Sequence, residues 1–148
     1  IDVLVMGTSD LVKELRARHT DDRRNLLYAL SRCVLAARAA GKDILDGVHL
    51  DFRNLEAFER ICAQGRDLGF DGKTLIHPTQ VEIANRVFGI DPDAVAHARA
   101  VIAAWEEARA SGRGVAVVDG ALIENLHVDE AARTIAFAEA LAARATGT

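Results

Sequence analysis

Three short apolar segments, each followed by a helical segment, constrain the fold of this chain more than any other feature. They cover residues 3–6, 44–50 and 73–76. The first is rich in branched side chains, which suit a strand that is buried on both faces. The stretches between them are long enough for helices, and such connections imply parallel strands with right-handed crossovers. The sequence therefore predicts an α/β fold that contains a parallel sheet.

Apolar residues at three- and four-residue spacing predict the helices between and after these strands. In the longest stripe, Leu26, Leu30 and Val34 recur on one face of a helix. Thr79 and Glu82 have the spacing of a capping box, which favours a helix that begins at Thr79. The predicted helices cover residues 11–18, 22–40, 53–68, 79–88, 92–110 and 127–143.

Three strands are too few to complete a parallel sheet of this kind. They can form the second half of an eight-stranded (β/α)8 TIM barrel, and the alternative is a small open three-layer sheet. The chain opens inside a predicted buried strand without a Met, so we expect it to be the later part of a longer polypeptide. Because the sheet edges would be unpaired, we expect residues 1–148 alone to be neither stably folded nor active.

The last quarter of the chain predicts a separate extension. The dipeptide Asp-Gly at residues 119–120 is a good two-residue turn, and it predicts a β-hairpin over residues 115–123. A linker-like stretch precedes this hairpin at residues 110–114. We therefore assign residues 1–110 to the half barrel and residues 111–148 to a C-terminal extension made of a hairpin and a helix.

Composition disfavours several classes of function. The net charge is −4 and no block of Lys and Arg occurs, so neither a nucleic acid nor a membrane surface is expected as a partner. No segment reaches the ~18 apolar residues of a membrane span, and no signal peptide is visible. Cys33 and Cys62 lack a CxxC pattern, which indicates small buried residues of a reducing compartment such as the cytoplasm.

A few polar residues near the predicted strands could carry chemistry. Asp10 and Asp46 fall near the carboxyl ends of strands, where α/β folds build their sites, and carboxylates there suit Mg²⁺. Asp10 is explained equally well as a helix N-cap, and Asp46 is better explained by a structural hydrogen bond. Lys73 stands at the start of its strand, which favours a structural role over a Schiff base. His77 could act as a base or a ligand, or it could fix a turn.

The segment at residues 68–88 carries a more specific pattern, LGFDGKTLIHPTQVEIANRVF, which resembles the HpcH/HpaI aldolase/citrate lyase family. The similarity is greatest to its CitE-like CoA-ester lyases, which include citrate lyase beta subunit, malyl-CoA lyase and citramalyl-CoA lyase. Residues 6–11, MGTSDL, resemble the family's G-x-x-D-L, and residues 36–54 resemble its A-A-R-A-x-G-…-D-G-V-x-x-D segment. Residues 117–125, VVDGALIEN, resemble its late x-G-x-M-I-D, so the resemblance covers nearly the whole chain.

This resemblance implies a TIM barrel whose active site lies at the carboxyl ends of the strands. In the family Mg²⁺ is held by one Glu and one Asp, and the Asp corresponds to Asp10. The Glu and a substrate-binding Arg are expected upstream of Ile1. The resemblance also implies two groups of substrate-binding residues. Gly7, Thr8 and Ser9 would offer backbone N–H groups to the carboxylate of a 2-oxo acid, and Ile76, His77 and Pro78 would form a wall beside CoA.

The chemistry implied by the resemblance is a reversible Claisen-type cleavage of a malyl-CoA-like or citramalyl-CoA-like ester to acyl-CoA and a 2-oxo acid. A carboxylate must handle a proton, and in the family this is the Asp of M-I-D. Here Glu124 stands in that position and would be the catalytic residue. Its extra methylene shifts the carboxyl by ~1 Å, which can cost on the order of 100-fold in a tight site. Thioester hydrolysis is therefore an alternative reaction, and a helix cap is the structural alternative for Glu124.

The resemblance also implies an assembly of identical subunits. In the family the C-terminal segment reaches a neighbouring subunit, so a homo-oligomer is expected, most often a trimer or hexamer. Besides the lyase and the thioesterase, a third hypothesis is a non-catalytic homologue that binds CoA esters without turning them over.

Overall fold

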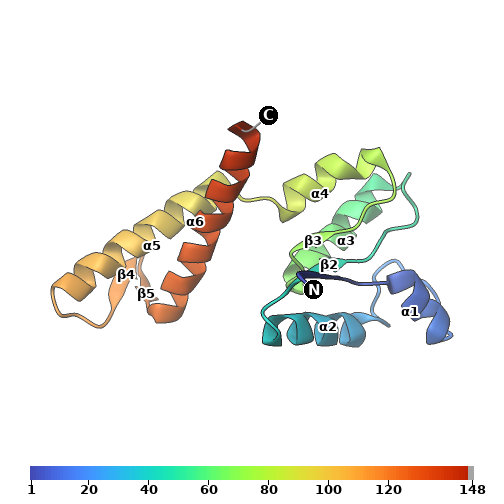
Figure 1. Ribbon diagram of the computed structural model, residues 1–148, viewed down its shortest axis with the longest axis horizontal. Coiled ribbons are helices and arrows are strands. Elements are labelled where there is room, and N and C mark those ends of the chain that lie inside the picture. The colour runs from blue at the N-terminus through green and yellow to red at the C-terminus, as the bar shows by residue number, and fades with distance from the viewer. Residues whose placement is uncertain (147–148) are drawn as a thin grey trace. The chain divides into compact units, whose positions relative to one another are not determined.

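The computed structural model describes residues 1–146, which fold into two compact units (Figure 1). Unit 1 comprises residues 1–89, and unit 2 begins at Ile90. The sequence placed this division at residues 110–111 instead. The difference arises because helix α5 (Pro92–Ala110) shares its apolar core with the elements that follow it.

Unit 1 contains a parallel sheet of three strands in the order β1-β2-β3. The strands are β1 (Val3–Val5), β2 (Asp43–Asp46) and β3 (Gly72–Lys73). Leu4 lies opposite Ile44, and Asp46 lies opposite Lys73. The parallel arrangement that the sequence predicted is confirmed. The third strand is shorter than predicted, because the chain leaves the ladder after Lys73 and soon turns into a 3-10 helix.

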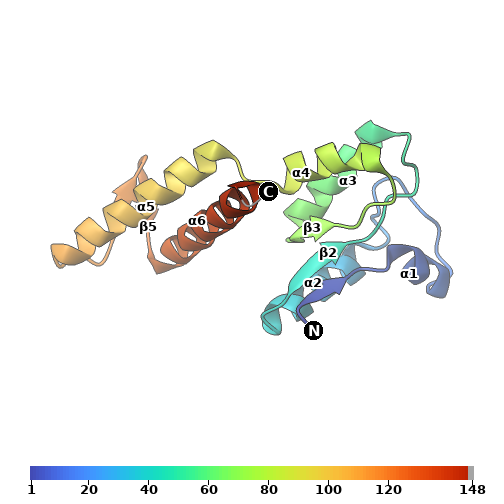
Figure 2. The ribbon, with the colours of Figure 1, turned by 45° about the horizontal axis from the view of Figure 1, so that its top comes forward.

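Four α-helices and one 3-10 helix complete unit 1, and Figure 2 shows α2 running alongside β2. They are α1 (Thr8–Glu14), α2 (Leu27–Ala39), α3 (Leu55–Asp67), the 3-10 helix η1 (Pro78–Gln80) and α4 (Val81–Phe88). Leu26, Leu30 and Val34 are buried together with Ile44 of β2, which confirms the predicted apolar stripe. A second buried cluster joins Phe58 and Cys62 of α3 to α4.

Helix starts in unit 1 differ from the sequence prediction, and the structure gives the reason for two of them. The helix predicted from residue 22 begins at Leu27, since Arg23 adopts a left-handed φ of 50° and turns its side chain into the interior. The capping box predicted at Thr79 is wrong. His77 is the N-cap instead, because its Nδ1 accepts a hydrogen bond from the backbone N–H of Thr79.

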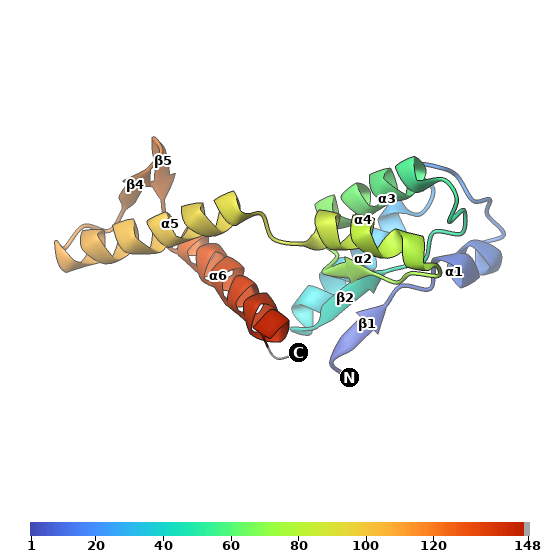
Figure 3. The same cartoon turned by 90° about the horizontal axis from the view of Figure 1, so that it is seen from above.

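Unit 2 consists of α5, a β-hairpin and the long helix α6 (Asn125–Thr146), and Figure 3 shows the hairpin beside α5. The hairpin strands are β4 (Ala116–Val118) and β5 (Ala121–Ile123), which pair antiparallel as predicted. Asp119 and Gly120 both have positive φ, at 50° and 79°, as a tight hairpin turn of this type requires. The buried core of unit 2 contains Ala98, Val101, Ala108, Ala116, Ile123 and Ala131.

No helix among residues 1–146 combines the length and the apolar character that crossing a membrane would need.

Candidate functional site

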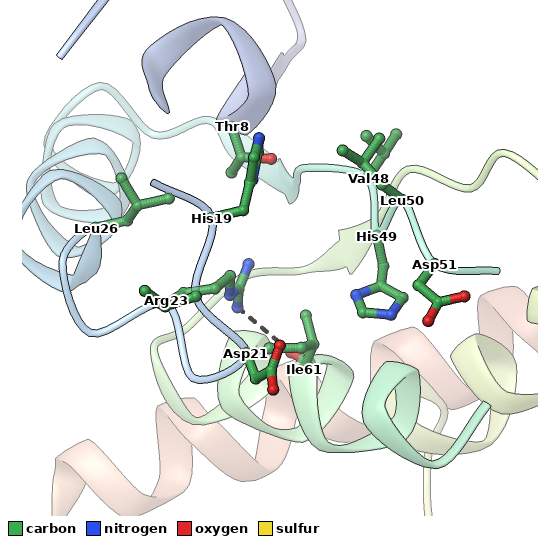
Figure 4. Close-up of a pocket in the computed structure, with 11 residues that line it drawn as sticks. Thr8, His19, Asp21, Arg23, Leu26, Val48, His49, Leu50, Asp51 and Ile61 are labelled. Atoms are coloured by element: carbon green, nitrogen blue, oxygen red, sulfur yellow. Dashed lines mark hydrogen bonds between the residues drawn. The ribbon is translucent and has the colours of Figure 1, made fainter. Parts of the chain in front are cut away.

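A pocket of about 190 Å³ lies beside the carboxyl ends of β1 and β2 in unit 1. Figure 4 shows Arg23 and His49 on opposite sides of it, with Ile61 of α3 between them. The start of α1, the loop between α1 and α2, the loop after β2 and helix α3 contribute to its lining, which includes Thr8, His19, Arg23, His49, Asp51 and Ile61. Loops at the carboxyl ends of parallel strands are the usual place for sites in α/β folds, so this end of unit 1 is the candidate site.

Helix α1, which follows β1 after a short loop, presents the carboxylate of Asp10. The N-cap of α1 is Gly7, and no side chain caps this helix. Asp10 is therefore not the N-cap that the sequence allowed. Asp10 lies in the first turn of the helix, where the helix dipole favours a negative charge. Its side chain is exposed and has no hydrogen-bond or ion-pair partner within residues 1–146. Thr8, in contrast, is buried beside the pocket.

Asp46 is fully buried, and its carboxylate is occupied by other side chains. Arg23 Nη1 donates to both carboxylate oxygens at 2.8 Å, and Lys73 Nζ donates to Oδ2 at 2.9 Å. The backbone N–H of Gly47 donates to Oδ1 at 2.8 Å. A carboxylate with this many donors has no lone pair left for a metal, so the structural role that the sequence favoured for Asp46 is confirmed.

Lys73 has the structural role that the sequence favoured as well. Its side chain is fully buried and also donates to the carbonyl oxygen of Gly47. Burial lowers the pKa of the Lys73 ammonium, because the charged form is disfavoured in the interior, and the adjacent Asp46 carboxylate opposes this shift. Both hydrogen bonds hold the ammonium in the interior beneath Gly47, so Lys73 connects β3 to the end of β2.

Arg23 is the member of this cluster that the sequence did not reveal. It also donates from Nε to Gln64 at 2.9 Å and from Nη2 to the carbonyl of Ile61 at 3.4 Å. We call Arg23, Asp46 and Lys73 the buried charge cluster. No motif marks Arg23, because the residues that bind it lie at least 23 positions away in the sequence.

The loop after β2 carries His49, which no sequence motif marks. Its ring lies 5.9 Å from the ring of Phe58, and its buried Nε2 has no partner in the described part of the chain. Burial, followed by the positive charge of Lys73, lowers the pKa of His49. The imidazole is therefore neutral at pH 7, and His49 lines the pocket.

The segment Ile76, His77 and Pro78 forms a fixed surface after β3. The backbone N–H of Ile76 donates to Gln80 Oε1 at 3.0 Å, and the Ile76 side chain is 48% exposed. His77 Nδ1 accepts from the Thr79 N–H at 3.3 Å and lies 2.9 Å from Thr79 Oγ1. His77 therefore fixes the turn, which was one of the roles that the sequence left open for it.

Glu124 belongs to unit 2 and lies directly before α6. Its backbone N–H donates to His127 Nδ1 at 3.0 Å, and its carbonyl accepts from the His127 N–H at 3.0 Å. The carboxylate itself is exposed and takes part in none of the hydrogen bonds or ion pairs of the described residues. The helix start is thus organised by the backbone of Glu124 together with the imidazole and backbone of His127, which leaves the Glu124 carboxylate available for another role.

The donor set for a metal in this chain is small. Within residues 1–146 no group of three or more His, Cys, Asp or Glu side chains is arranged to hold a metal ion. Asp10 offers a single exposed carboxylate, and Mg²⁺ in proteins often takes only one or two carboxylates while keeping several waters. Asp10 therefore fits one ligand position of Mg²⁺. Cys62 does not fit, because burial raises the pKa of its thiol to about 11.

Comparison with known proteins places the chain in a family. The sequence profile of the HpcH/HpaI aldolase/citrate lyase family matches residues 1–78, and the chain belongs to this family. Among its relatives, a (3S)-malyl-CoA thioesterase of Cereibacter sphaeroides is 55% identical over 140 residues, which are 95% of this chain and 49% of that protein. Citrate lyase subunit beta of Escherichia coli is 33% identical over 136 residues, which are 92% of this chain and 45% of that protein.

A solved structure agrees with this assignment. The structure of protein CitE from Mycobacterium tuberculosis in complex with magnesium, acetoacetate and coenzyme A has a TM-score of 0.69 and 29% identity. The match covers 88% of this chain and 49% of that chain. Unit 1 is therefore part of a TIM barrel, as the sequence predicted, and not a small open sheet. The chain spans about half the length of the curated relatives it matches.

Proposed function

We propose that the intact protein is a Mg²⁺-dependent enzyme that acts on a CoA ester similar to malyl-CoA. The observation that carries this proposal is the Asp10 carboxylate in the first turn of α1, just beyond the carboxyl end of β1, which is exposed and has no partner among the described residues. The relatives support the substrate class, since one is named a (3S)-malyl-CoA thioesterase and CitE was solved with magnesium and coenzyme A.

Each candidate residue has a distinct role in this proposal. Asp10 would hold Mg²⁺, which when bound supplies a Lewis acid for the oxygen at the reacting carbon. Gly7, Thr8 and Ser9 begin α1, so their backbone N–H groups suit the acid carboxylate of the substrate. The surface made by Ile76, His77 and Pro78 would lie beside CoA.

Glu124 would take up or release the proton that the reaction requires. Its exposed carboxylate, free of partners within the described residues, supports this role.

Thioester hydrolysis is the reaction we propose first. In it, the oxygen of water bonds to the thioester carbon, the carbon–sulfur bond breaks, and the thiol of CoA takes a proton. The 55% identity to a (3S)-malyl-CoA thioesterase supports hydrolysis. Glu124 stands where the family resemblance implied an Asp, and this difference is compatible with a reaction other than carbon–carbon cleavage.

Carbon–carbon cleavage is the second candidate, as the sequence first indicated. Here the hydroxyl of the ester loses its proton, the bond to the carbon next to the thioester breaks, and that carbon gains a proton. The products are acyl-CoA and a 2-oxo acid. The 33% identity to citrate lyase subunit beta supports this reaction.

We further propose that unit 2 packs against a neighbouring copy of the same protein. Its exposed large apolar side chains support this, and they are Val115, Val117, Leu122, Leu126, Phe137 and Leu141. Covering such residues in an interface removes apolar surface from water. The intact protein is expected to form a trimer or hexamer in light scattering coupled to size exclusion. A monomer at micromolar concentration would contradict this prediction.

The test of the proposed function uses the Asp10→Asn variant of the intact protein. With malyl-CoA and Mg²⁺, the wild type is expected to release free CoA, and the variant to lose activity by on the order of 100-fold, because the amide is a poor Mg²⁺ ligand. Asp67→Asn is the matched control, since Asp67 is exposed at the end of α3. Its activity should equal that of the wild type.

The products distinguish the remaining hypotheses. Free CoA without a 2-oxo acid supports the thioesterase, whereas acyl-CoA with a 2-oxo acid supports the lyase. If the protein binds malyl-CoA but forms neither product, it is a non-catalytic homologue. Equal activities of wild type and Asp10→Asn would exclude Asp10 as the metal ligand.

A further inference from the structure

A stack of three side chains connects the loop after β2 with the turn after β3. The ring of Phe52 lies on the imidazole of His77, with ring centroids 4.6 Å apart and an angle of 18° between the planes. On the same loop, the guanidinium carbon of Arg53 lies 5.5 Å from the centroid of the Phe52 ring. His77 is a candidate site residue from the sequence, whereas no motif marks Phe52 or Arg53.

The stack is held in place from both sides. His77 cannot turn freely, because its Nδ1 is bound to the backbone and close to the hydroxyl of Thr79. The loop that carries Arg53 is fixed by a hydrogen bond from the Arg53 N–H to Asp51 Oδ1 at 3.3 Å and by Asn54, the N-cap of α3. A ligand that meets this surface would therefore find it largely preorganised.

The charge on Arg53 is not used within the structure. Its side chain is exposed, and within residues 1–146 it forms no ion pair and donates no hydrogen bond. Contact with the Phe52 ring limits the directions that the guanidinium can take. A planar guanidinium with all its donors free is well suited to bind a phosphate group through two hydrogen bonds.

We propose that Phe52 and Arg53 extend the surface of Ile76, His77 and Pro78 into a site for the phosphorylated nucleotide part of CoA. In this site Arg53 binds a phosphate, while Phe52 supports the ring of His77 against which the nucleotide lies. The proposal rests on the proposed function, because it takes CoA esters as the substrates. It adds the residues by which the enzyme would distinguish a CoA ester from a shorter pantetheine ester.

The experiment compares Arg53→Gln with wild type in the intact protein, using malyl-CoA and malyl-pantetheine as substrates. Because the pantetheine ester has no nucleotide, the variant should raise KM for malyl-CoA about tenfold, with kcat unchanged, and leave KM for malyl-pantetheine as it is. Arg60→Gln is the matched control, since Arg60 is an exposed Arg on α3 whose guanidinium pairs with Glu56. Its KM for both substrates should match the wild type.

Two binding probes make the outcomes separable. Titration of wild type with CoA tests the proposed function, and no binding of CoA would remove the basis of both proposals. If wild type binds CoA and Arg53→Gln binds it equally well, this inference is wrong while the proposed function stands. Dephospho-CoA, which lacks the 3′-phosphate, identifies the phosphate involved. If Arg53→Gln weakens the binding of CoA but not that of dephospho-CoA, Arg53 binds the 3′-phosphate. If the binding of both is weakened equally, Arg53 binds the diphosphate.

Phe52→Leu gives an independent check. It keeps an apolar side chain but removes the aromatic ring that lies on His77. It is expected to raise KM for malyl-CoA severalfold, again without a change for malyl-pantetheine. An equal rise for both substrates would show that Phe52 only supports the loop, which would contradict its place in the nucleotide site.

Discussion

Asp46→Asn is expected to lower the free energy of unfolding of the intact protein by about 3–5 kcal/mol, which is the usual cost of removing one partner from a buried ion pair. Asn has nearly the shape of Asp, so the change removes the charge and little else. Arg23 and Lys73 would then share the interior without a counter-ion, since both donate to the Asp46 carboxylate at 2.8–2.9 Å. The loss can be measured by urea unfolding of the intact protein.

The pH dependence of the same variant gives a second readout. Burial already lowers the folded-state pKa of Lys73 below its unfolded value of 10.5, and Asp46 opposes this shift. Without the Asp46 carboxylate, the folded-state pKa of Lys73 falls further. Between the two pKa values the unfolded state binds more protons, so the stability of the variant should rise with pH up to the unfolded pKa of Lys73. The defect of Asp46→Asn is therefore expected to be smaller at alkaline pH than at pH 7.

A control on the same strand separates burial from the loss of a charge. Asp43 lies on β2 as Asp46 does, but its side chain is exposed. Asp43→Asn should change the free energy of unfolding by less than about 0.5 kcal/mol. If Asp46→Asn were no more destabilising than Asp43→Asn, the buried charge cluster would contribute little to the stability of the protein.

The parts of the fold that the sequence predicted rest on local patterns. The stripe of Leu26, Leu30 and Val34 is a matter of spacing, and the three residues are buried together as expected. The turn of Asp119 and Gly120 depends on two residues that tolerate positive φ, and the hairpin formed where it was predicted. Such patterns can be detected in a single sequence because their causes lie within a few residues.

The parts that the sequence did not predict depend on contacts between distant residues. Arg23 stops α2 from starting at residue 22, because its guanidinium reaches Asp46 and Gln64, 23 and 41 positions away. In the candidate site, Asp10 could be proposed from its place after a strand. The stack of Phe52 on His77 could not, since nothing local to either residue indicates the other.

Gly47→Ala is expected to be the second most damaging change, with a loss of about 3 kcal/mol in the free energy of unfolding from overpacking. A Cβ at Gly47 would lie 2.3 Å from Thr8 Oγ1 and 2.7 Å from both Thr8 Cγ2 and the carbonyl oxygen of Met6. Thr8 is buried, so its side chain has little room to move aside. The Met6 carbonyl is also restrained, since the Met6 N–H donates to the carbonyl of Leu45 at 2.9 Å.

The double variant Gly47→Ala with Thr8→Ala tests this account in detail. Removing Thr8 Oγ1 and Cγ2 eliminates two of the three close contacts, but the contact with the Met6 carbonyl stays. Relative to the sum of the single changes, the double variant should recover part of the lost stability and not all of it. Gly114→Ala is the control, because a Cβ there meets nothing within 4 Å. Its stability should match the wild type.

The same substitution is also expected to affect activity, since Thr8 stands two residues before the proposed metal ligand Asp10. Any shift that relieves the contact with Gly47 must move the start of α1, and displacing a reacting group by ~1 Å can cost on the order of 100-fold in rate. Gly47→Ala should therefore lose kcat on malyl-CoA at a temperature where circular dichroism shows it still folded. Full activity in the folded variant would mean that the close packing of Gly47 against Thr8 stabilises unit 1 without positioning Asp10.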